Sequence, residues 1–229
     1  MNEKQLKCTT EAGEYQKAWF AQLRKDVFDE HKSYAIAQAD MPLELFSLMG
    51  MPVVSNQWWS AMISAKKLSG YYMDRRKEMG FHENLCSYCS LGLACTLDNK
   101  PEVAPWGGLP KPAIMSDRLT CDCIQRIFEI WATKFGTTFY PLDSTANTNL
   151  PPRWWEMSRY DWESLFQTHR LDFMTQQLYG LVKELEKITD KSFNINKGMA
   201  SICKAAFHLP TDLAEITNPS AAAAARTPP

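Results

Sequence analysis

The fold class is decided by residues 113–140, AIMSDRLTCDCIQRIFEIWATKFGTTFY. The apolar run Ala113–Met115 predicts a buried strand that leads into Ser116-Asp117. Apolar residues then recur at helical spacing, which predicts a helix over Cys121–Phe135 that ends at Gly136. Thr137–Tyr140 predicts a second strand. A strand, a helix and a strand in succession favour a parallel sheet covered by helices, so we expect an α/β fold.

The residues before this stretch continue the same alternation. Two short apolar segments, 34–37 and 52–54, predict further strands, and Gly50 and Gly80 end predicted helices. The helices expected from apolar periodicity are 10–30, 43–49, 57–79 and 82–96. We therefore predict a three-layer, Rossmann-like parallel sheet with an N-terminal helical segment over residues 1–33 and an α/β domain over 34–157.

The pattern changes in the last third of the chain. Helical periodicity continues for about thirty residues from Arg159, which predicts one long helix, and a further helix is expected over Ile195–Phe207. Residues 158–209 are thus expected to form a helical extension. The alanine-rich and proline-ended stretch 210–229 is expected to be disordered.

Composition excludes several classes of function. The 229 residues carry 25 Lys+Arg against 26 Asp+Glu, so no basic field for nucleic acid is present. No apolar run is long enough to span a membrane, and we expect a cytoplasmic protein. The chain also lacks the local motifs of phosphate-loop, dinucleotide-binding, α/β-hydrolase and zincin proteins.

The seven cysteines are the main chemical signal. Cys86, Cys89 and Cys95 lie close together in sequence, and Cys121 and Cys123 flank Asp122. Cys86 and Cys121 stand at predicted helix N-termini, where the helix dipole favours thiolates. Three interpretations stay open at this point: an iron–sulfur or zinc site, redox-active thiols, or small buried side chains.

Two tryptophan pairs, Trp58-Trp59 and Trp154-Trp155, form a second signal. Adjacent rings cannot both be buried in one direction, so at least one of each pair is expected at a cleft or an interface. An aromatic pocket for an acyl group and a subunit interface are both compatible with this pattern.

Several short motifs occur together in a fixed order. They are Asp40-Met41-Pro42-Leu43-Glu44-Leu45, Gly50-Met51-Pro52-Val53, Leu85-Cys86-Ser87-Tyr88, Leu109-Pro110-Lys111-Pro112, Cys121-Asp122-Cys123 and Phe128-Glu129. In order and spacing, over roughly residues 34–190, the chain resembles the 2-hydroxyacyl-CoA dehydratase / benzoyl-CoA reductase family.

This resemblance implies an oxygen-sensitive enzyme subunit that holds a [4Fe–4S] cluster. The family's cluster cysteines correspond to Cys86 and Cys121, whereas Cys89 and Cys123 occupy positions that the family does not require. The resemblance also implies a CoA-thioester substrate, a related second subunit and a separate ATP-dependent iron–sulfur activator protein that delivers one electron. The substrate carbonyl would take this electron as a ketyl radical.

Two departures from the family pattern shape the hypothesis. The stretch Val54–Trp58 contains no carboxylate where dehydratase subunits commonly have Pro-Glu-Asn, so a reductase-like or non-catalytic subunit is also compatible. Family members are longer, and a second α/β domain supplies their third cysteine. We therefore expect this chain to be the N-terminal portion of a subunit, and we expect Cys203 not to be the third ligand.

Our leading hypothesis is a dehydratase or aromatic acyl-CoA reductase subunit that uses one-electron chemistry. Cys86 and Cys121 are its predicted metal ligands, and Ser87, Trp58 and Trp59 are predicted to lie near the acyl group. The alternative is a non-enzymatic, zinc- or thiol-containing α/β interaction domain whose tryptophans bind a partner.

Overall fold

The structure is a computed structural model that describes residues 6–143 and 150–196. The helices are α1 (Lys7–Arg24), the π-helix Lys25–Asp29, α2 (Leu43–Leu48), α3 (Asn56–Ala65), α4 (Ser69–Glu78), α5 (Ser87–Asp98), the 3-10 helix Pro105–Gly107, α6 (Asp122–Phe135), α7 (Trp154–Tyr160), α8 (Trp162–Leu165) and α9 (Thr168–Thr189). The strands are β1 (Ala35–Ala37), β2 (Val53–Ser55), β3 (Ile114–Arg118) and β4 (Thr138–Leu142). All four strands match segments that the sequence predicted.

The strands form one parallel sheet in the order β2-β1-β3-β4. Ala35 on β1 pairs with Val53 on one side and Ile114 on the other, and Ile114 pairs with Thr138. Because the chain turns in opposite directions from β1 and from β3, the order reverses between these two central strands. In parallel sheets, this switch point at the carboxyl ends of the strands is where ligands bind.

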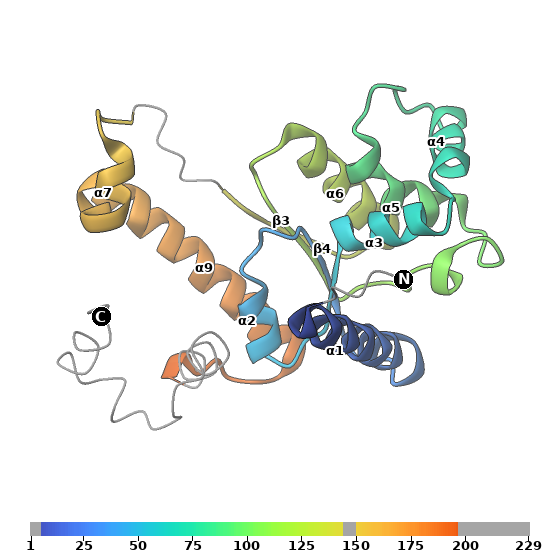
Figure 1. Ribbon diagram of the computed structural model, residues 1–229, viewed down its shortest axis with the longest axis horizontal. Coiled ribbons are helices and arrows are strands. Elements are labelled where there is room, and N and C mark those ends of the chain that lie inside the picture. The colour runs from blue at the N-terminus through green and yellow to red at the C-terminus, as the bar shows by residue number, and fades with distance from the viewer. Residues whose placement is uncertain (1–5, 144–149, 197–229) are drawn as a thin grey trace.

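Helices cover both faces of the sheet, and alternate strand residues point to different cores. Ile36 and Met115 belong to a core shared with α1, α3, α5 and α6, whereas Ala35 and Ile114 belong to a core shared with α2 and α9. Figure 1 shows α3, α4, α5 and α6 together on one side of the sheet and α2 and α9 on the other. The predicted three-layer, Rossmann-like α/β fold is confirmed.

Two long helices predicted from periodicity are each interrupted. The segment 57–79 divides into α3 and α4 because Lys67 adopts a left-handed conformation with φ of 59°. The segment from Arg159 divides at Gln167, which is extended with ψ of 137°, and at Asp161, which lies outside helical geometry with φ of −150°. Its side chain accepts a hydrogen bond from Ser164, as an asparagine or aspartate at a helix start does.

The C-terminal helix is a layer of the α/β domain. Leu181 and Leu185 of α9 are fully buried against the sheet. The predicted helix over Ile195–Phe207 lies almost entirely outside the described residues, as does the predicted disordered tail. The domain boundaries at 33, 157 and 209 stay predictions.

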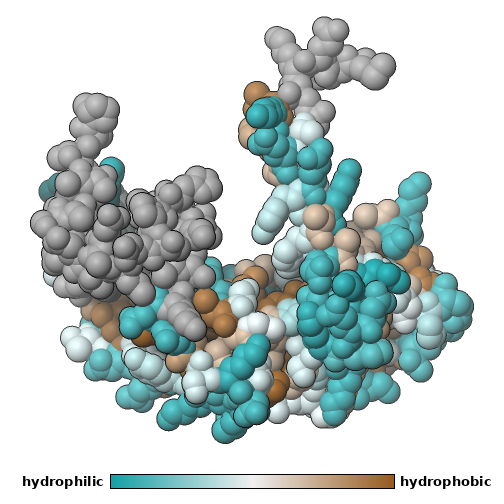
Figure 2. All heavy atoms as spheres, turned by 90° about the horizontal axis from the view of Figure 1, so that it is seen from below, coloured by the Kyte–Doolittle hydropathy of each residue, from teal (hydrophilic) through white to brown (hydrophobic). Residues whose placement is uncertain are grey.

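The outer surface carries mixed residues. On the face seen in Figure 2, hydrophobic residues form patches between hydrophilic ones. Among the described residues, no helix has the length and apolar character to cross a membrane.

The contact between α5 and α6 depends on a glycine. A Cβ atom on Gly92 of α5 would lie 2.5 Å from Cη2 of Trp131 and 2.9 Å from Oδ1 of Asn56. Trp131 is fully buried, and its Nε1 donates a hydrogen bond to Thr96 on α5 at 2.9 Å. The two helices therefore approach each other more closely than a larger residue at position 92 would permit.

Gly92→Ala is expected to lower the free energy of unfolding by about 1–2 kcal/mol, because overpacking outweighs the better helix propensity of alanine. Gly70→Ala on α4 is the matched control, since a Cβ atom there meets nothing within 4 Å. We expect the control to be neutral or to stabilise by up to ~1 kcal/mol. Urea unfolding of both variants measures the difference, and equal effects at the two positions would contradict the close packing.

Candidate functional site

The two cysteines predicted as metal ligands both cap helices. Cys86 is the N-cap of α5, and Cys121 is the N-cap of α6, which follows β3. Both cysteines are exposed. The predicted helix 82–96 begins later than expected, at Ser87, and the helix predicted from Cys121 begins at Asp122. Each cysteine therefore stands where unpaired backbone N–H groups and the helix dipole favour an anion.

Packing between α5 and α6 brings further thiols to the same place. Cys89, one turn into α5, is buried, and Cys123, in the first turn of α6, is half-buried. The Cys86 thiol interacts with the thiols of both. The charge of Cys121 also acts on Cys89 and Cys123, so four cysteines from two helix N-termini converge.

The environment divides these thiols into two types. Burial raises the pKa of the Cys86 thiol, but backbone N–H groups of Cys89 and Tyr88 and the thiols of Cys89 and Cys123 lower it overall. For Cys89, burial and then the contact with Cys86 raise the pKa. Burial likewise raises the pKa of Cys123. The environment therefore stabilises the thiolate of Cys86 relative to an ordinary cysteine and destabilises the thiolates of Cys89 and Cys123.

The described residues do not close a metal site. Within residues 6–143 and 150–196, no group of three or more His, Cys, Asp or Glu side chains is arranged to hold a metal ion. Soft thiolates at helix N-termini have the donor chemistry that iron–sulfur clusters and zinc require. Cys86 and Cys121 thus fit as part of a ligand set. The prediction about Cys203 lies outside the described residues.

The residues predicted near an acyl group differ in their exposure. Ser87 is the first residue of α5, next to Cys86, and is half-buried. Trp58 is half-buried and stacks on Phe20 of α1 with ring centroids 4.3 Å apart. Trp59 is fully buried, so no ligand can touch its ring in this arrangement. Both indoles also contact Trp106, which makes them parts of an aromatic core beneath α1.

The second tryptophan pair lies at the surface. Trp154 is 42% exposed and Trp155 is 58% exposed, at the start of α7. In the first pair, one ring is buried and the other is only partly covered. Binding of an acyl group by Ser87, Trp58 and Trp59 stays a prediction.

A buried carboxyl at the switch point received no role from the sequence. Asp117 on β3 is fully buried, and neither of its carboxyl oxygens has a hydrogen-bond partner. Burial and the nearby charge of Asp40, which follows β1, raise the pKa of Asp117 to about 6. Asp117 lies on the same face of the sheet as Met115, because strand residues alternate, and this face is covered by α3, α5 and α6.

Asn56 connects the end of β2 to the first turn of α5, which carries Cys89. It is the first residue of α3 and is fully buried. Its Nδ2 donates a hydrogen bond to the carbonyl oxygen of Cys89 at 3.1 Å. The nearby Gln57 accepts a hydrogen bond from the backbone N–H of Ala39 at 2.9 Å. The amides at positions 56 and 57 therefore hold the loops of the switch point together.

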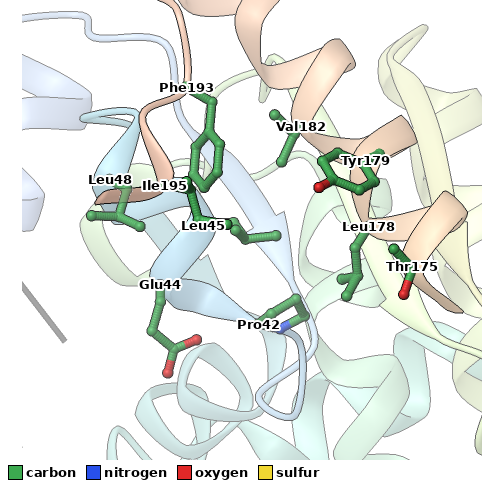
Figure 3. Close-up of a pocket in the computed structure, with 10 residues that line it drawn as sticks. All are labelled: Pro42, Glu44, Leu45, Leu48, Thr175, Leu178, Tyr179, Val182, Phe193 and Ile195. Atoms are coloured by element: carbon green, nitrogen blue, oxygen red, sulfur yellow. The ribbon is translucent and has the colours of Figure 1, made fainter. Parts of the chain in front are cut away.

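Two hollows lie on the other face of the sheet. A crevice of about 250 Å³ at the carboxyl ends of the strands is lined by Asp40, Arg118 and Asp143, together with residues of α9. A larger apolar groove of about 340 Å³ lies between α2 and α9. In Figure 3, Leu45 and Leu48 face Tyr179 and Val182 across this groove. Because the cysteines lie on the α5 and α6 side, the larger groove is separated from them by the sheet.

A comparison with known protein families shows which family this chain belongs to. A family model described as "2-hydroxyglutaryl-CoA dehydratase, D-component" matches residues 38–206. The chain belongs to this family. The matched range contains α5, α6, all four converging cysteines and the Asp40–Asp117 pair. Its bounds agree closely with the resemblance found from the motifs.

A search of curated proteins found no match to the chain. The 2-hydroxyglutaryl-CoA dehydratase D-component family is named for a dehydratase component that acts on a CoA thioester. Membership therefore identifies the chain as a relative of dehydratase components, on an α/β scaffold whose exposed cysteines cap two adjacent helices.

Proposed function

We propose that this chain is the iron–sulfur part of a CoA-thioester dehydratase subunit. The observation that carries the proposal is the pair of exposed cysteines, Cys86 and Cys121, that cap α5 and α6 within the matched family region. These two residues would hold a [4Fe–4S] cluster, and further ligands would come from outside the described residues. When bound, such a cluster supplies single electrons at low potential.

The residues around the cysteines support this role. The backbone N–H groups of Tyr88 and Cys89 stabilise the thiolate of Cys86, the form in which cysteine binds metal. Ser87 lies next to Cys86 and offers a hydroxyl to an acyl group. The buried Asn56 ties the end of β2 to the Cys89 carbonyl, which limits movement of the turn that carries Cys86 and Cys89.

The carboxyls at the switch point offer proton chemistry. Stretch 54–58 has no carboxylate, but Asp117 and Asp40 stand at the ends of the two central strands. A buried carboxyl with a raised pKa can hold a proton near neutral pH. Dehydration of a 2-hydroxyacyl group needs a proton for the departing hydroxyl and a base for the proton at C3. Asp40, which lines the crevice, would face the substrate, and the buried Asp117 would act through Asp40.

The remaining parts of the assignment follow from the family. We propose a CoA thioester as substrate, a related second subunit as partner and an ATP-dependent iron–sulfur protein as electron donor. The chain would work in the cytoplasm, where thiols stay reduced. An aromatic acyl-CoA reductase of the benzoyl-CoA type would use the same electron input on a ring.

A second candidate function has its own observation. A structural zinc site in a non-enzymatic interaction domain would use the sulfurs of Cys86, Cys89, Cys121 and Cys123, which act on one another electrostatically. Among the described residues, no three of these side chains are arranged to hold a metal ion, which opposes a zinc site closed by these four cysteines alone. We therefore favour the cluster.

Metal and acid-labile sulfide analysis of protein purified without oxygen separates the two functions. A dehydratase subunit should contain iron together with sulfide in equal amounts after anaerobic reconstitution. Zinc without sulfide would support the interaction domain instead. A protein that retains neither iron nor zinc would contradict both.

A further inference from the structure

A buried arginine on α4 has no role in the site described so far. Arg76 is only 2% exposed. Its neighbours in sequence form ion pairs, Arg75 with Asp98 and Lys77 with Glu83. Within the described part of the chain, no carboxylate forms an ion pair with Arg76. Among the described residues, the positive charge of Arg76 is therefore buried without a negative partner.

The guanidinium group of Arg76 holds the turn that leads into α5. Its Nη1 donates hydrogen bonds to the carbonyl oxygen of Leu85 and to the hydroxyl of Ser90, both at 2.7 Å. Its Nη2 donates to the carbonyl oxygen of Glu83 at 2.9 Å. Ser90 in turn donates to the carbonyl oxygen of Cys86 at 2.8 Å. The side chain thus contacts the residues on both sides of Cys86.

These hydrogen bonds only partly compensate the free-energy cost of burying the guanidinium charge. Removing an ion from water costs several kcal/mol in a real protein, and neutral carbonyl groups recover part of that cost. The Nε atom of Arg76 has no partner. The nearby N-terminus of α5 adds the positive end of a helix dipole. Repulsion between this dipole and the guanidinium group would raise the cost of burial further unless an anion lay at Cys86. The arrangement is therefore suited to a negative centre.

We propose that Arg76 is a positioning residue for Cys86, which fixes the Glu83–Cys86 turn and supplies the buried positive charge behind an anionic, thiolate-bound centre. The inference deepens the proposed function and rests on it for the identity of that centre. Arg76 acts through the turn and through its charge, and it does not itself touch a substrate.

The test separates the effect of the Arg76 charge from the effect of its hydrogen bonds. Arg76→Lys keeps the charge and loses the planar group, whereas Arg76→Gln keeps hydrogen-bond donors and loses the charge. Arg75→Gln is the control, because Arg75 is one residue away but is paired with Asp98 near the surface. Ser90→Ala is a fourth variant that removes the link to the Cys86 carbonyl while leaving Arg76 in place.

The first readout needs no metal. In the metal-free chain, alkylation of Cys86 by iodoacetamide at neutral pH is followed by peptide mass spectrometry, with Cys121 as the internal reference. We expect Arg76→Gln to slow Cys86 roughly threefold or more relative to Cys121, because fewer thiolates form. Arg76→Lys and Arg75→Gln should stay near the wild-type ratio. A Cys86 rate that rises or stays unchanged in Arg76→Gln would overturn the charge role.

Ser90→Ala keeps the test decisive if Arg76→Gln does not fold. Hydrogen exchange of the backbone amides of residues 87–90 is expected to quicken in Ser90→Ala, because the turn loses its tie to Arg76. Unchanged exchange would overturn the positioning role.

The second readout uses reconstituted protein. If iron and sulfide bind, Arg76→Gln is expected to shift the midpoint potential of the cluster to a lower value, because a nearby positive charge favours the reduced form. Arg76→Lys should retain the wild-type potential, and equal potentials in all variants would overturn the charge role. Absence of a cluster in wild-type protein would contradict the proposed function, while the alkylation and exchange results would still decide the role of Arg76.

Discussion

Asp117→Asn is expected to raise the free energy of unfolding at pH 8 by up to about 3 kcal/mol. Asp117 is fully buried, and its two oxygens have no hydrogen-bond partners. Burial and Asp40 raise the pKa of Asp117 from 3.8 to about 6, and a tenfold change in an acid dissociation constant corresponds to about 1.4 kcal/mol. Asparagine has nearly the same shape and never ionises, so it removes the cost of burying the charge.

The pH dependence has a definite sign. Between pH 3.8 and about 6, the folded protein binds more protons at Asp117 than the unfolded chain does, so this group makes stability fall as pH rises. Below pH 3.8 the carboxyl is neutral in both states, and above about 6 the cost is fully present. The advantage of Asp117→Asn should therefore be absent near pH 3.5, grow through this window and stay constant above it.

Urea unfolding across this pH range measures the effect. Asp122→Asn, at the exposed start of α6, is the control and should show no such gain. Asp40→Asn removes the neighbouring charge and should give a smaller gain than Asp117→Asn. A loss of stability in Asp117→Asn at every pH would mean that the carboxylate has a stabilising partner.

The stabilising substitution also bears on function. If Asp117 exchanges protons in a dehydratase, Asp117→Asn should be more stable and less active at the same time. Such a combination is typical of residues kept for activity at the expense of stability. A variant that gains stability and keeps full activity would remove Asp117 from the proton exchange.

Local patterns were sufficient to predict the sheet and most helix ends. Residues 121–135 have strong helical periodicity and are followed by a glycine. Helix α6 ends at Phe135, and Gly136 adopts a left-handed conformation. Periodicity failed where a helix bends without a proline or glycine. Lys67 takes a left-handed conformation because tertiary packing directs both α3 and α4 into the core, which local sequence does not encode.

The candidate site was predictable only in part. Cys86 and Cys121 were found from their motifs and their places at helix starts. The approach of Cys89 and Cys123 to Cys86 depends on how α5 packs on α6 through Gly92 and Trp131. The burial of Asp117 and Arg76 depends on which helices cover the sheet. A single aspartate after an apolar strand, or an arginine in a basic run, gives no such signal in sequence.

Single cysteine substitutions should have a large effect on cluster binding. Cys86→Ala or Cys121→Ala is expected to remove most of the iron bound after reconstitution, because an already open ligand set loses one of its two exposed cysteines. Cys123→Ala should retain iron, since Cys123 is half-buried and burial raises its pKa, which disfavours its thiolate. Cys8→Ala, on the distant and exposed start of α1, is the matched control.

Cluster binding by Cys86 and Cys121 is tested most sharply by the iron and acid-labile sulfide content of these four variants beside the wild type, measured after anaerobic reconstitution. We expect iron with equal sulfide in wild type, Cys8→Ala and Cys123→Ala, and little of either in Cys86→Ala and Cys121→Ala. Iron and sulfide content that is unchanged in Cys86→Ala and Cys121→Ala would show that these cysteines do not hold the cluster.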